Sequence, residues 1–209
     1  MRSQPVGDSV QRVEGHEPRE GRETPMPNAE SSSQGRDPRD VAICRYLETH
    51  DIPYQRFDHE LVYTCEEADR FVPAAAVGVQ TKNLFVRDKR GRRHLLIVTS
   101  CAKAVDLKAT AGALGADSLS LGSPERLMTH LGVSPGSVTL LALAHDGSSS
   151  VELVVDSDVW TGEALRCHPM VNSATLLLSH DAARRFIETT GHSLHVVKVP
   201  AIVRAPSDS

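Results

Sequence analysis

Residues 81–99, TKNLFVRDKRGRRHLLIVT, constrain the fold of this chain more than any other stretch. Two runs of strand character flank a short polar segment that contains Gly91, and glycine supplies the positive φ that a tight turn often needs. The pattern predicts a β-hairpin, in which neighbouring strands pair without a helical crossover. A chain built around such a hairpin is not expected to be a doubly wound, purely parallel sheet.

Helices and further strands are predicted on both sides of the hairpin. Capping residues and apolar spacing predict helices at residues 39–52 (with Asp40 as the N-cap), 64–71, 106–116, 123–133 and 179–192. Apolar runs predict strands at residues 54–64, 138–144, 151–157, 174–179 and 193–200. The expected fold class is α+β (mixed α/β), with a mixed, mainly antiparallel sheet and surrounding helices.

Composition divides the 209 residues into one domain and two tails. Residues 1–36 contain no Leu, Ile, Phe, Tyr or Trp, so they cannot bury enough apolar area to offset their ordering entropy. We expect residues 1–36 to be a disordered tail, residues 37–203 to form one domain, and residues 204–209 to be a flexible C-terminal tail.

Charge, motifs and cysteine usage exclude several classes of protein. A net charge of −4 argues against a general nucleic-acid coating protein, although it leaves room for a local basic patch. No apolar run approaches the length of a membrane span, and no dinucleotide-binding or phosphate-loop motif is present. We therefore expect no membrane, no DNA, no metal and no cofactor. Cys44, Cys65, Cys101 and Cys167 are widely spaced, which predicts free thiols in a reducing, cytoplasmic compartment.

Basic side chains are concentrated in the hairpin. Lys82 lies at its base, and the others crowd its tip: Arg87, Lys89, Arg90, Arg92 and Arg93. The tip either keeps a polar turn soluble or contacts a polyanion. Lys82 is either a point charge for a phosphate or carbonyl oxygen, or a strand-end lysine whose charge reaches solvent.

Residues 166–179, RCHPMVNSATLLLS, contain a second group of polar residues directly before an apolar strand. His168 and Asn172 flank Pro169, and they either line the mouth of a pocket or satisfy the backbone of their own turn. Cys167 is adjacent to His168, so in an extended segment the two side chains point to opposite sides and cannot form a nucleophile–base pair. The sequence offers no self-evident nucleophile.

Seven segments now resemble, in order, the YbaK/prolyl-tRNA synthetase editing-domain superfamily. They are HELVYTCEEA, TKNLFVRDKRGRRHLLIVT, VDLKATAGALGA, SPERLMTHLGVSPGSV, VVDSDVW, CHPMVNSATLLLS and FIETTGH. Within that superfamily the chain is most similar to the free-standing ProX/PrdX proteins, also called prolyl-tRNA synthetase-associated domain proteins. The resemblance spans nearly the whole predicted domain.

The resemblance implies a mixed α/β fold with a partly barrel-like sheet. It implies hydrolysis, in trans, of mischarged Ala-tRNA(Pro), with the acceptor end of tRNA(Pro) as the partner and prolyl-tRNA synthetase as a second candidate partner. This family is thought to rely on a hydroxyl of the tRNA itself and on a bound water, which agrees with the missing nucleophile.

The resemblance also assigns residues to roles. It places catalysis on Lys82, His168 and Gly136, and substrate binding on Asn83, Asn172 and Ser173. RNA contacts would fall on the basic side chains of the hairpin tip. The Gly-x-x-x-Pro substrate loop of the family falls on residues 136–140, where Leu140 stands in place of the usual proline and leaves the rigidity of the loop open.

Two alternatives remain. One is a deacylase for Cys-tRNA(Pro) or another small amino acid, because Val171 and Ser173 stand where some members carry threonine. The other is a non-catalytic tRNA- or synthetase-binding module. Leu140 favours this loss of activity, whereas intact Lys82 and His168 disfavour it.

Overall fold

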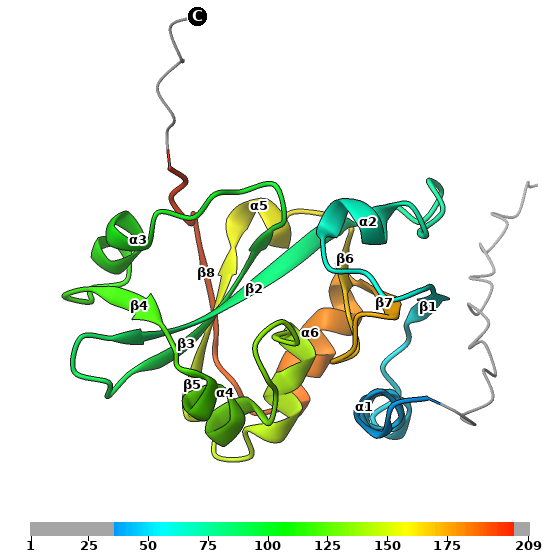
Figure 1. Cartoon of the computed structure of the whole chain (residues 1–209), viewed down its shortest axis with the longest axis horizontal. Helices are drawn as coiled ribbons and strands as arrows, with labels where there is room; N and C mark the ends of the chain where they lie inside the picture. Colours follow the sequence, from blue (N-terminus) through cyan, green and yellow to red (C-terminus); the bar gives the residue numbers. More distant parts are fainter. Residues whose placement is uncertain (1–35, 203–209) are drawn as a thin grey trace, which may run out of the picture.

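The computed structural model describes residues 36–202, so the predicted tails, apart from Arg36, lie outside the described residues. The helices are α1 (Pro38–Thr49), α2 (Cys65–Asp69), α3 (Leu107–Ala113), α4 (Pro124–Leu131), α5 (Ser157–Trp160) and α6 (His180–Thr189), with a 3-10 helix, η1 (Leu140–His145). The strands are β1 (Gln55–Asp58), β2 (Val79–Asp88), β3 (His94–Ser100), β4 (Leu119–Leu121), β5 (Val151–Asp156), β6 (Ala164–Cys167), β7 (Ala174–Ser179) and β8 (Leu194–Val197). Figure 1 shows the helices arranged around one twisted sheet.

The sheet is built around the predicted hairpin. Strands β2 and β3 pair antiparallel from Thr81 opposite Ser100 to Arg87 opposite His94. The strand order is β1-β7-β6-β2-β3-β5-β8, with β4 also paired to β2. The β1–β7, β2–β3, β2–β4 and β6–β7 pairs are antiparallel, whereas β2–β6, β3–β5 and β5–β8 are parallel. The predicted mixed α/β fold with a mixed sheet is confirmed, and the sheet is open rather than closed.

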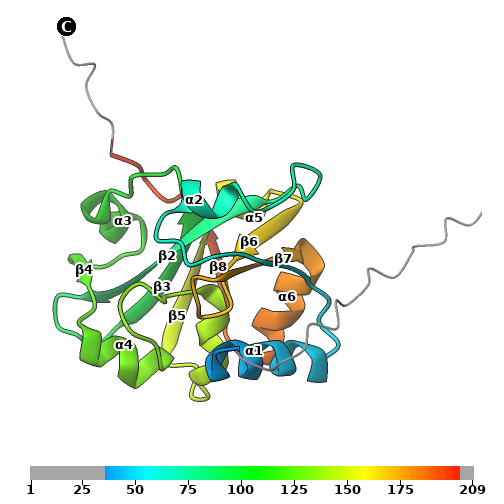
Figure 2. The ribbon, with the colours of Figure 1, turned by 45° about the vertical axis from the view of Figure 1, so that its right-hand side comes forward.

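Both faces of the central strands are buried. In β3, Leu96 and Val98 face the larger core, which also contains Leu47 of α1 and Phe186 of α6. Leu95 and Ile97 belong to a smaller cluster on the other face. Figure 2 shows α1 and α6 close together, and the Tyr46 and Phe186 rings meet edge to face with centroids 6.0 Å apart. Because two cores share β3, its sequence reads as a continuous apolar run.

The helix ends show how far local capping rules hold. Ser123 caps α4, Pro124 is its first residue, and Gly132 ends it in the left-handed conformation, as predicted. The prediction for Asp40 was wrong, because Asp37 is the N-cap of α1. Asp40 instead lies in the first turn, 2% exposed, where Arg56 Nη1 binds its Oδ1 at 2.7 Å. A residue that looks like a cap in sequence therefore fixes α1 to β1.

The predicted strand at residues 138–144 is also wrong. Residues 140–145 form the 3-10 helix η1, in which Leu140, Leu141 and Leu143 are at most 1% exposed. A short, uniformly apolar run has no period that separates a strand from a buried helical turn. Here the Thr139 hydroxyl accepts a hydrogen bond from the Leu141 N–H, and this cap starts the turn.

The predicted free thiols are half right. Cys44 and Cys167 are free and buried, but Cys65 and Cys101 form a disulfide with a Cα–Cα distance of 6.2 Å. Their separation of 36 positions along the chain hid the pair from sequence analysis. They meet because β2 and β3 fold back as a hairpin, which brings the residue after β3 beside the start of α2. In the part of the chain that the structure describes, no helix is long and apolar enough to cross a membrane.

Candidate functional site

A cavity of about 240 Å³ lies at the base of the hairpin. Four parts of the chain line it: the segment from His59 through α2, strand β2, the loop before η1, and the turn between β6 and β7. The lining residues are His59, Val62, Tyr63, Thr64, Cys65, Ala68, Gln80, Thr81, Lys82, Asn83, Gly136, Val138, Arg166, Cys167, His168, Asn172, Ala174 and Thr175. The structure thus brings Lys82, Asn83, Gly136, His168 and Asn172 together, although the sequence separates them widely.

His168 is held as a neutral imidazole. Burial lowers its pKa to about 4, and the hydrogen bond to the Val138 carbonyl opposes this shift only in part. The His168 Nε2 atom lies 3.0 Å from the Val138 oxygen, so Nε2 carries the proton and donates it there. The other ring nitrogen, Nδ1, is therefore an acceptor. It is buried and has no partner within residues 36–202.

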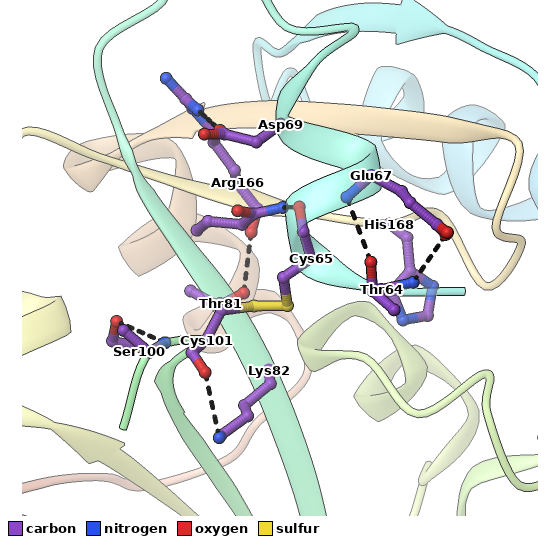
Figure 3. The surroundings of a disulfide bond; sticks show 12 residues. Thr64, Cys65, Glu67, Asp69, Thr81, Lys82, Ser100, Cys101, Arg166 and His168 are labelled. Carbon is purple, nitrogen blue, oxygen red and sulfur yellow. Dashed lines mark hydrogen bonds and ion pairs between the residues drawn. A yellow bond between two sulfur atoms is a disulfide. The ribbon is translucent and has the colours of Figure 1, made fainter. Parts of the chain in front are cut away.

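Lys82 supplies a positive charge at the same cavity. Its Nζ donates to the backbone carbonyl of Cys101 at 3.1 Å, and Figure 3 shows the lysine reaching the residue that carries the disulfide. An ammonium group has three donors, so this single bond leaves others for a ligand. Lys82 is therefore held at the cavity wall with donor capacity to spare.

The substrate-loop candidate at residues 136–140 is tied to the cavity by its carbonyls. Gly136 has φ +88°, a conformation that favours glycine, and its carbonyl accepts from Asn172 Nδ2 at 3.4 Å. The Val138 carbonyl binds His168. Leu140, 1% exposed, anchors the end of the loop in the core. Burial of the leucine fixes the end of the loop through side-chain packing, whereas a proline would act by fixing its own φ.

Two further buried polar atoms at this cavity lack a partner within the described residues. They are Asn83 Oδ1, an acceptor, and Arg166 Nε, a donor. Arg166 donates through Nη1 to Asp69 and through Nη2 to the Ala76 carbonyl, both at 2.6 Å. Buried polar groups are normally paired, so these atoms leave the residues of the cavity wall with unused hydrogen-bonding capacity.

Sequence analysis missed Arg166 and His59. Arg166 lies two residues before His168, a spacing that puts both on one face of an extended segment, and this spacing could have revealed it. His59 Nδ1 binds the Glu60 carbonyl at 2.8 Å, which leaves Nε2 to accept from the Thr175 hydroxyl at 3.1 Å. Nothing in the local sequence pairs His59 with Thr175, which is 116 residues away.

The cavity offers no activated thiol. Cys65 is held in the disulfide, and burial raises the pKa of Cys167 to about 12, so its thiol stays protonated. Across residues 36–202, no three His, Cys, Asp or Glu side chains gather as a metal site. Covalent attack by a cysteine is therefore not the chemistry of this cavity.

Ser173 and the basic tip lie away from the cavity. Ser173 is exposed and is not among the lining residues. At roughly 3.3 Å per residue along β2, the tip begins about 20 Å from Lys82. There Arg93 pairs with Glu152 at 2.7 Å, and Arg87 Nη1 donates to the Asp88 and Lys89 carbonyls. Lys89, Arg90 and Arg92 are exposed.

Comparison with known proteins places this site in a family. A family model described as "Aminoacyl-tRNA editing domain" matches residues 59–186. The chain belongs to the aminoacyl-tRNA editing domain family. It is 30% identical, over 76% of its length and 96% of the relative's, to a protein of Acetoanaerobium sticklandii named "Prolyl-tRNA editing protein ProX". It is 36% identical, over 71% of its length and 80% of the relative's, to "Prolyl-tRNA synthetase associated domain-containing protein 1" of Danio rerio.

The editing-domain fold is also found in solved structures. The crystal structure of a candidate trans-editing enzyme for prolyl tRNA synthetase superposes with a TM-score of 0.59 at 18% identity, covering 79% of this chain and 99% of the other. Every residue that lines the cavity falls within the range matched by the editing-domain family, residues 59–186.

Proposed function

We propose that this chain is a trans-editing deacylase that hydrolyses mischarged Ala-tRNA(Pro) in the cytoplasm. Its substrate partner would be the acceptor end of tRNA(Pro), and prolyl-tRNA synthetase is proposed as a second partner. The family supports this activity, since the named relatives are a prolyl-tRNA editing protein and a prolyl-tRNA synthetase-associated protein. The cavity supports a small acyl group, because its volume is below the roughly 300–1,000 Å³ of common ligand pockets.

One observation carries the proposal: the unpartnered polar atoms of the cavity match an aminoacyl ester. Asn83 Oδ1 and His168 Nδ1 are acceptors, which suit an α-ammonium group or a ribose hydroxyl. Lys82 Nζ and Arg166 Nε are donors, which suit a carbonyl or phosphate oxygen. A molecule that brings both kinds of group within a few atoms of each other satisfies all four residues, and an aminoacylated ribose is such a molecule.

Water is the nucleophile in this proposal. It adds to the ester carbonyl, and the ribose oxygen leaves as a hydroxyl, so that a free amino acid and an uncharged tRNA are formed. The Lys82 ammonium stabilises negative charge as it develops on the carbonyl oxygen. His168, neutral at pH 7, accepts a hydrogen bond that orients the substrate rather than carrying a proton.

The proline site of a synthetase cannot strongly exclude an amino acid that is smaller than proline. A second site that removes the wrong amino acid after the charging step is therefore useful. One missing methylene changes binding by only about 1–3 kcal/mol. In this proposal, the wall formed by Val62, Val138 and Ala174 fits the methyl group of alanine better than the larger proline ring. The non-catalytic alternative loses its main support here, because Leu140 is a buried anchor for the substrate loop.

The test is hydrolysis of Ala-tRNA(Pro), Cys-tRNA(Pro) and Pro-tRNA(Pro) by the full chain, Lys82→Ala and Lys108→Ala. Lys108 is an exposed lysine of α3 and serves as the matched control. We expect rapid loss of alanine alone, abolished in Lys82→Ala and unchanged in Lys108→Ala. Preference for the cysteinyl ester would mean that the substrate is Cys-tRNA(Pro) rather than Ala-tRNA(Pro). Inertness toward all three esters, with tRNA still bound, would refute the deacylase and leave a binding module.

A further inference from the structure

The disulfide joins two walls of the cavity. Cys65 is the first residue of α2 and lines the cavity, and Cys101 directly follows β3 (Figure 3). Both cysteines are partly exposed, whereas the two free cysteines, Cys44 and Cys167, are buried. A thiol in solution therefore reaches the disulfide more readily than it reaches the other two sulfurs.

Helix α2 has few contacts of its own with the rest of the fold. It has five residues, all of them described, and none is buried. Its internal capping box, formed by Thr64 and Glu67, does not attach it to the sheet. Besides the disulfide, its residues are tied to the sheet by the Gln80 Nε2 bond to the Cys65 carbonyl at 2.6 Å and the Arg166 bond to Asp69. The flanking segments are anchored separately: the Val62 N–H donates to the Asn172 carbonyl at 3.0 Å, and Val72 is buried in a small apolar cluster. Helices this short are not stable on their own.

The two ends of the disulfide differ in how firmly they are held. The Cys101 N–H donates to the Gln80 carbonyl at 2.9 Å, so Cys101 stays with the sheet whether or not the disulfide is intact. Its carbonyl also keeps its bond to Lys82. Cys65 belongs to a helix that has no buried residue, so packing holds it less firmly than the sheet holds Cys101. Breaking the bond would therefore loosen α2 between its anchored flanks, with the cavity-lining residues Tyr63, Thr64 and Ala68, and leave Lys82 in position.

From this asymmetry we propose that Cys65 and Cys101 form a thiol–disulfide exchange site that sets the mobility of the α2 wall. The reagent class is a dithiol. Its thiolate attacks one sulfur of the pair to give a mixed disulfide, and its second thiol then displaces the protein thiol. Two electrons and two protons pass from the dithiol to Cys65 and Cys101, and the dithiol becomes a disulfide.

The consequence for catalysis rests on the proposed function. With the bond formed, α2 closes one side of the cavity, so a small aminoacyl group is held tightly and a larger one is excluded. With the bond reduced, we expect KM for Ala-tRNA(Pro) to rise about 3- to 10-fold and Pro-tRNA(Pro) to be cleaved relatively faster, with kcat changed less. The reason is that Lys82 lies on β2 and His168 directly follows β6 and binds the Val138 carbonyl, so neither is positioned by α2.

The first experiment does not depend on activity. The full chain is held in dithiothreitol buffers of graded oxidised-to-reduced ratio, alkylated under denaturing conditions and weighed by mass spectrometry. We expect two alkylated cysteines in the oxidised form and four in the reduced form. Amide hydrogen exchange is then compared for residues 62–72, and we expect faster exchange after reduction, with residues 94–100 of β3 unchanged. Four alkylated cysteines under oxidising buffer would overturn the proposal.

The second experiment compares deacylation kinetics in the two forms. Cys65→Ser and Cys101→Ser should each match the reduced wild type and lose their response to dithiothreitol, whereas Cys44→Ser should keep it. A bond that forms while hydrogen exchange and KM stay equal would overturn the proposal in favour of a purely structural disulfide. Changed hydrogen exchange with no deacylation in either form would uphold the exchange site and refute the proposed function, so the two failures are distinguishable.

Discussion

The two ends of the β2–β3 hairpin are both rich in positive charge, yet they have different surroundings. At the base, Lys82 is partly buried at a cavity that also contains a neutral histidine and three unpartnered polar atoms. At the tip, Lys89, Arg90 and Arg92 are exposed. A charge at the base acts on one atom at short range, because little water screens it. Charges at the tip act on a whole surface and are screened by salt.

This difference separates two functions that the sequence presents as one basic stretch. The base has the geometry for chemistry on a single bond, and the tip has the exposure for steering a polyanion. We therefore propose that the base sets the rate of hydrolysis and the tip sets the affinity for RNA. Each of the following predictions tests that division.

The largest effect is expected from removing the charge at the base. Lys82→Met keeps the length of the side chain but removes the ammonium that stabilises the developing oxyanion. We expect kcat for Ala-tRNA(Pro) to fall about 10²–10³-fold, or about 2.7–4 kcal/mol. Lys89→Met, the same change at the tip, is the matched control and should leave kcat within about twofold of wild type. Single-turnover assays measure the effect. Equal losses of rate in the two variants would contradict the assignment of hydrolysis to the base alone.

The second prediction concerns the neutral histidine at the base. The pKa of His168 is lowered to about 4 from its ordinary 6.5, mainly by burial. As the pH falls from 6.5 toward 4, the unfolded chain binds a proton that the folded site excludes, so the free energy of unfolding decreases. We expect a loss of about 2–3 kcal/mol over this range that is absent from His168→Gln. Urea unfolding at several pH values measures it, and parallel pH curves for the two proteins would contradict it.

The third prediction concerns the tip. Replacing Lys89, Arg90 and Arg92 with alanine should weaken tRNA binding about tenfold at low salt and leave kcat unchanged. Because each phosphate contact contributes about 0.7–0.9 to the salt slope, the slope should decrease by about 2–3. Filter binding at several salt concentrations measures both quantities. A charge-matched triple variant at exposed positions of three helices is the control: Arg45, Lys108 and Arg184. Equal loss in the control would show only a dependence on net charge.

The smallest effect is expected at the turn of the tip. Gly91 has φ +67°, so Gly91→Ala should lower the free energy of unfolding by about 1–2 kcal/mol without changing kcat. Gly147→Ala is the control, because its φ is not positive and an added Cβ meets nothing within 4 Å. Thermal unfolding of both variants measures the difference. A fall in kcat for Gly91→Ala would mean that the tip and the base are mechanically coupled.

Local patterns were sufficient to predict much of the fold. The hairpin at residues 81–99 and the limits of α4 follow from turn and capping chemistry within a few residues, which a sequence displays directly. Residues 138–144 were misassigned because burial on all sides removes the polar positions that reveal a period. Asp40 was misassigned because its partner, Arg56, lies 16 residues away.

The candidate site was predicted only where family resemblance marked it. Lys82, Asn83, Gly136, His168 and Asn172 all line the cavity. Composition and spacing alone left Lys82, His168 and Asn172 with a structural alternative and did not mark Asn83 or Gly136. Arg166 was missed although its spacing from His168 was visible, whereas the His59–Thr175 pair and the disulfide were missed for a physical reason. Both depend on side chains that the folded sheet brings together from distant parts of the chain.

The buried helix η1 connects the wall of the cavity to the interior of the protein. Residues 136–139, which present the Gly136 and Val138 carbonyls to the cavity, run directly into Leu140–Leu143 in the core. A change in core volume under η1 therefore displaces those carbonyls, although no residue that touches the ligand has altered. Under the proposed editing function, relatives of this chain could therefore differ in amino-acid preference through core substitutions, which a comparison restricted to cavity residues would overlook.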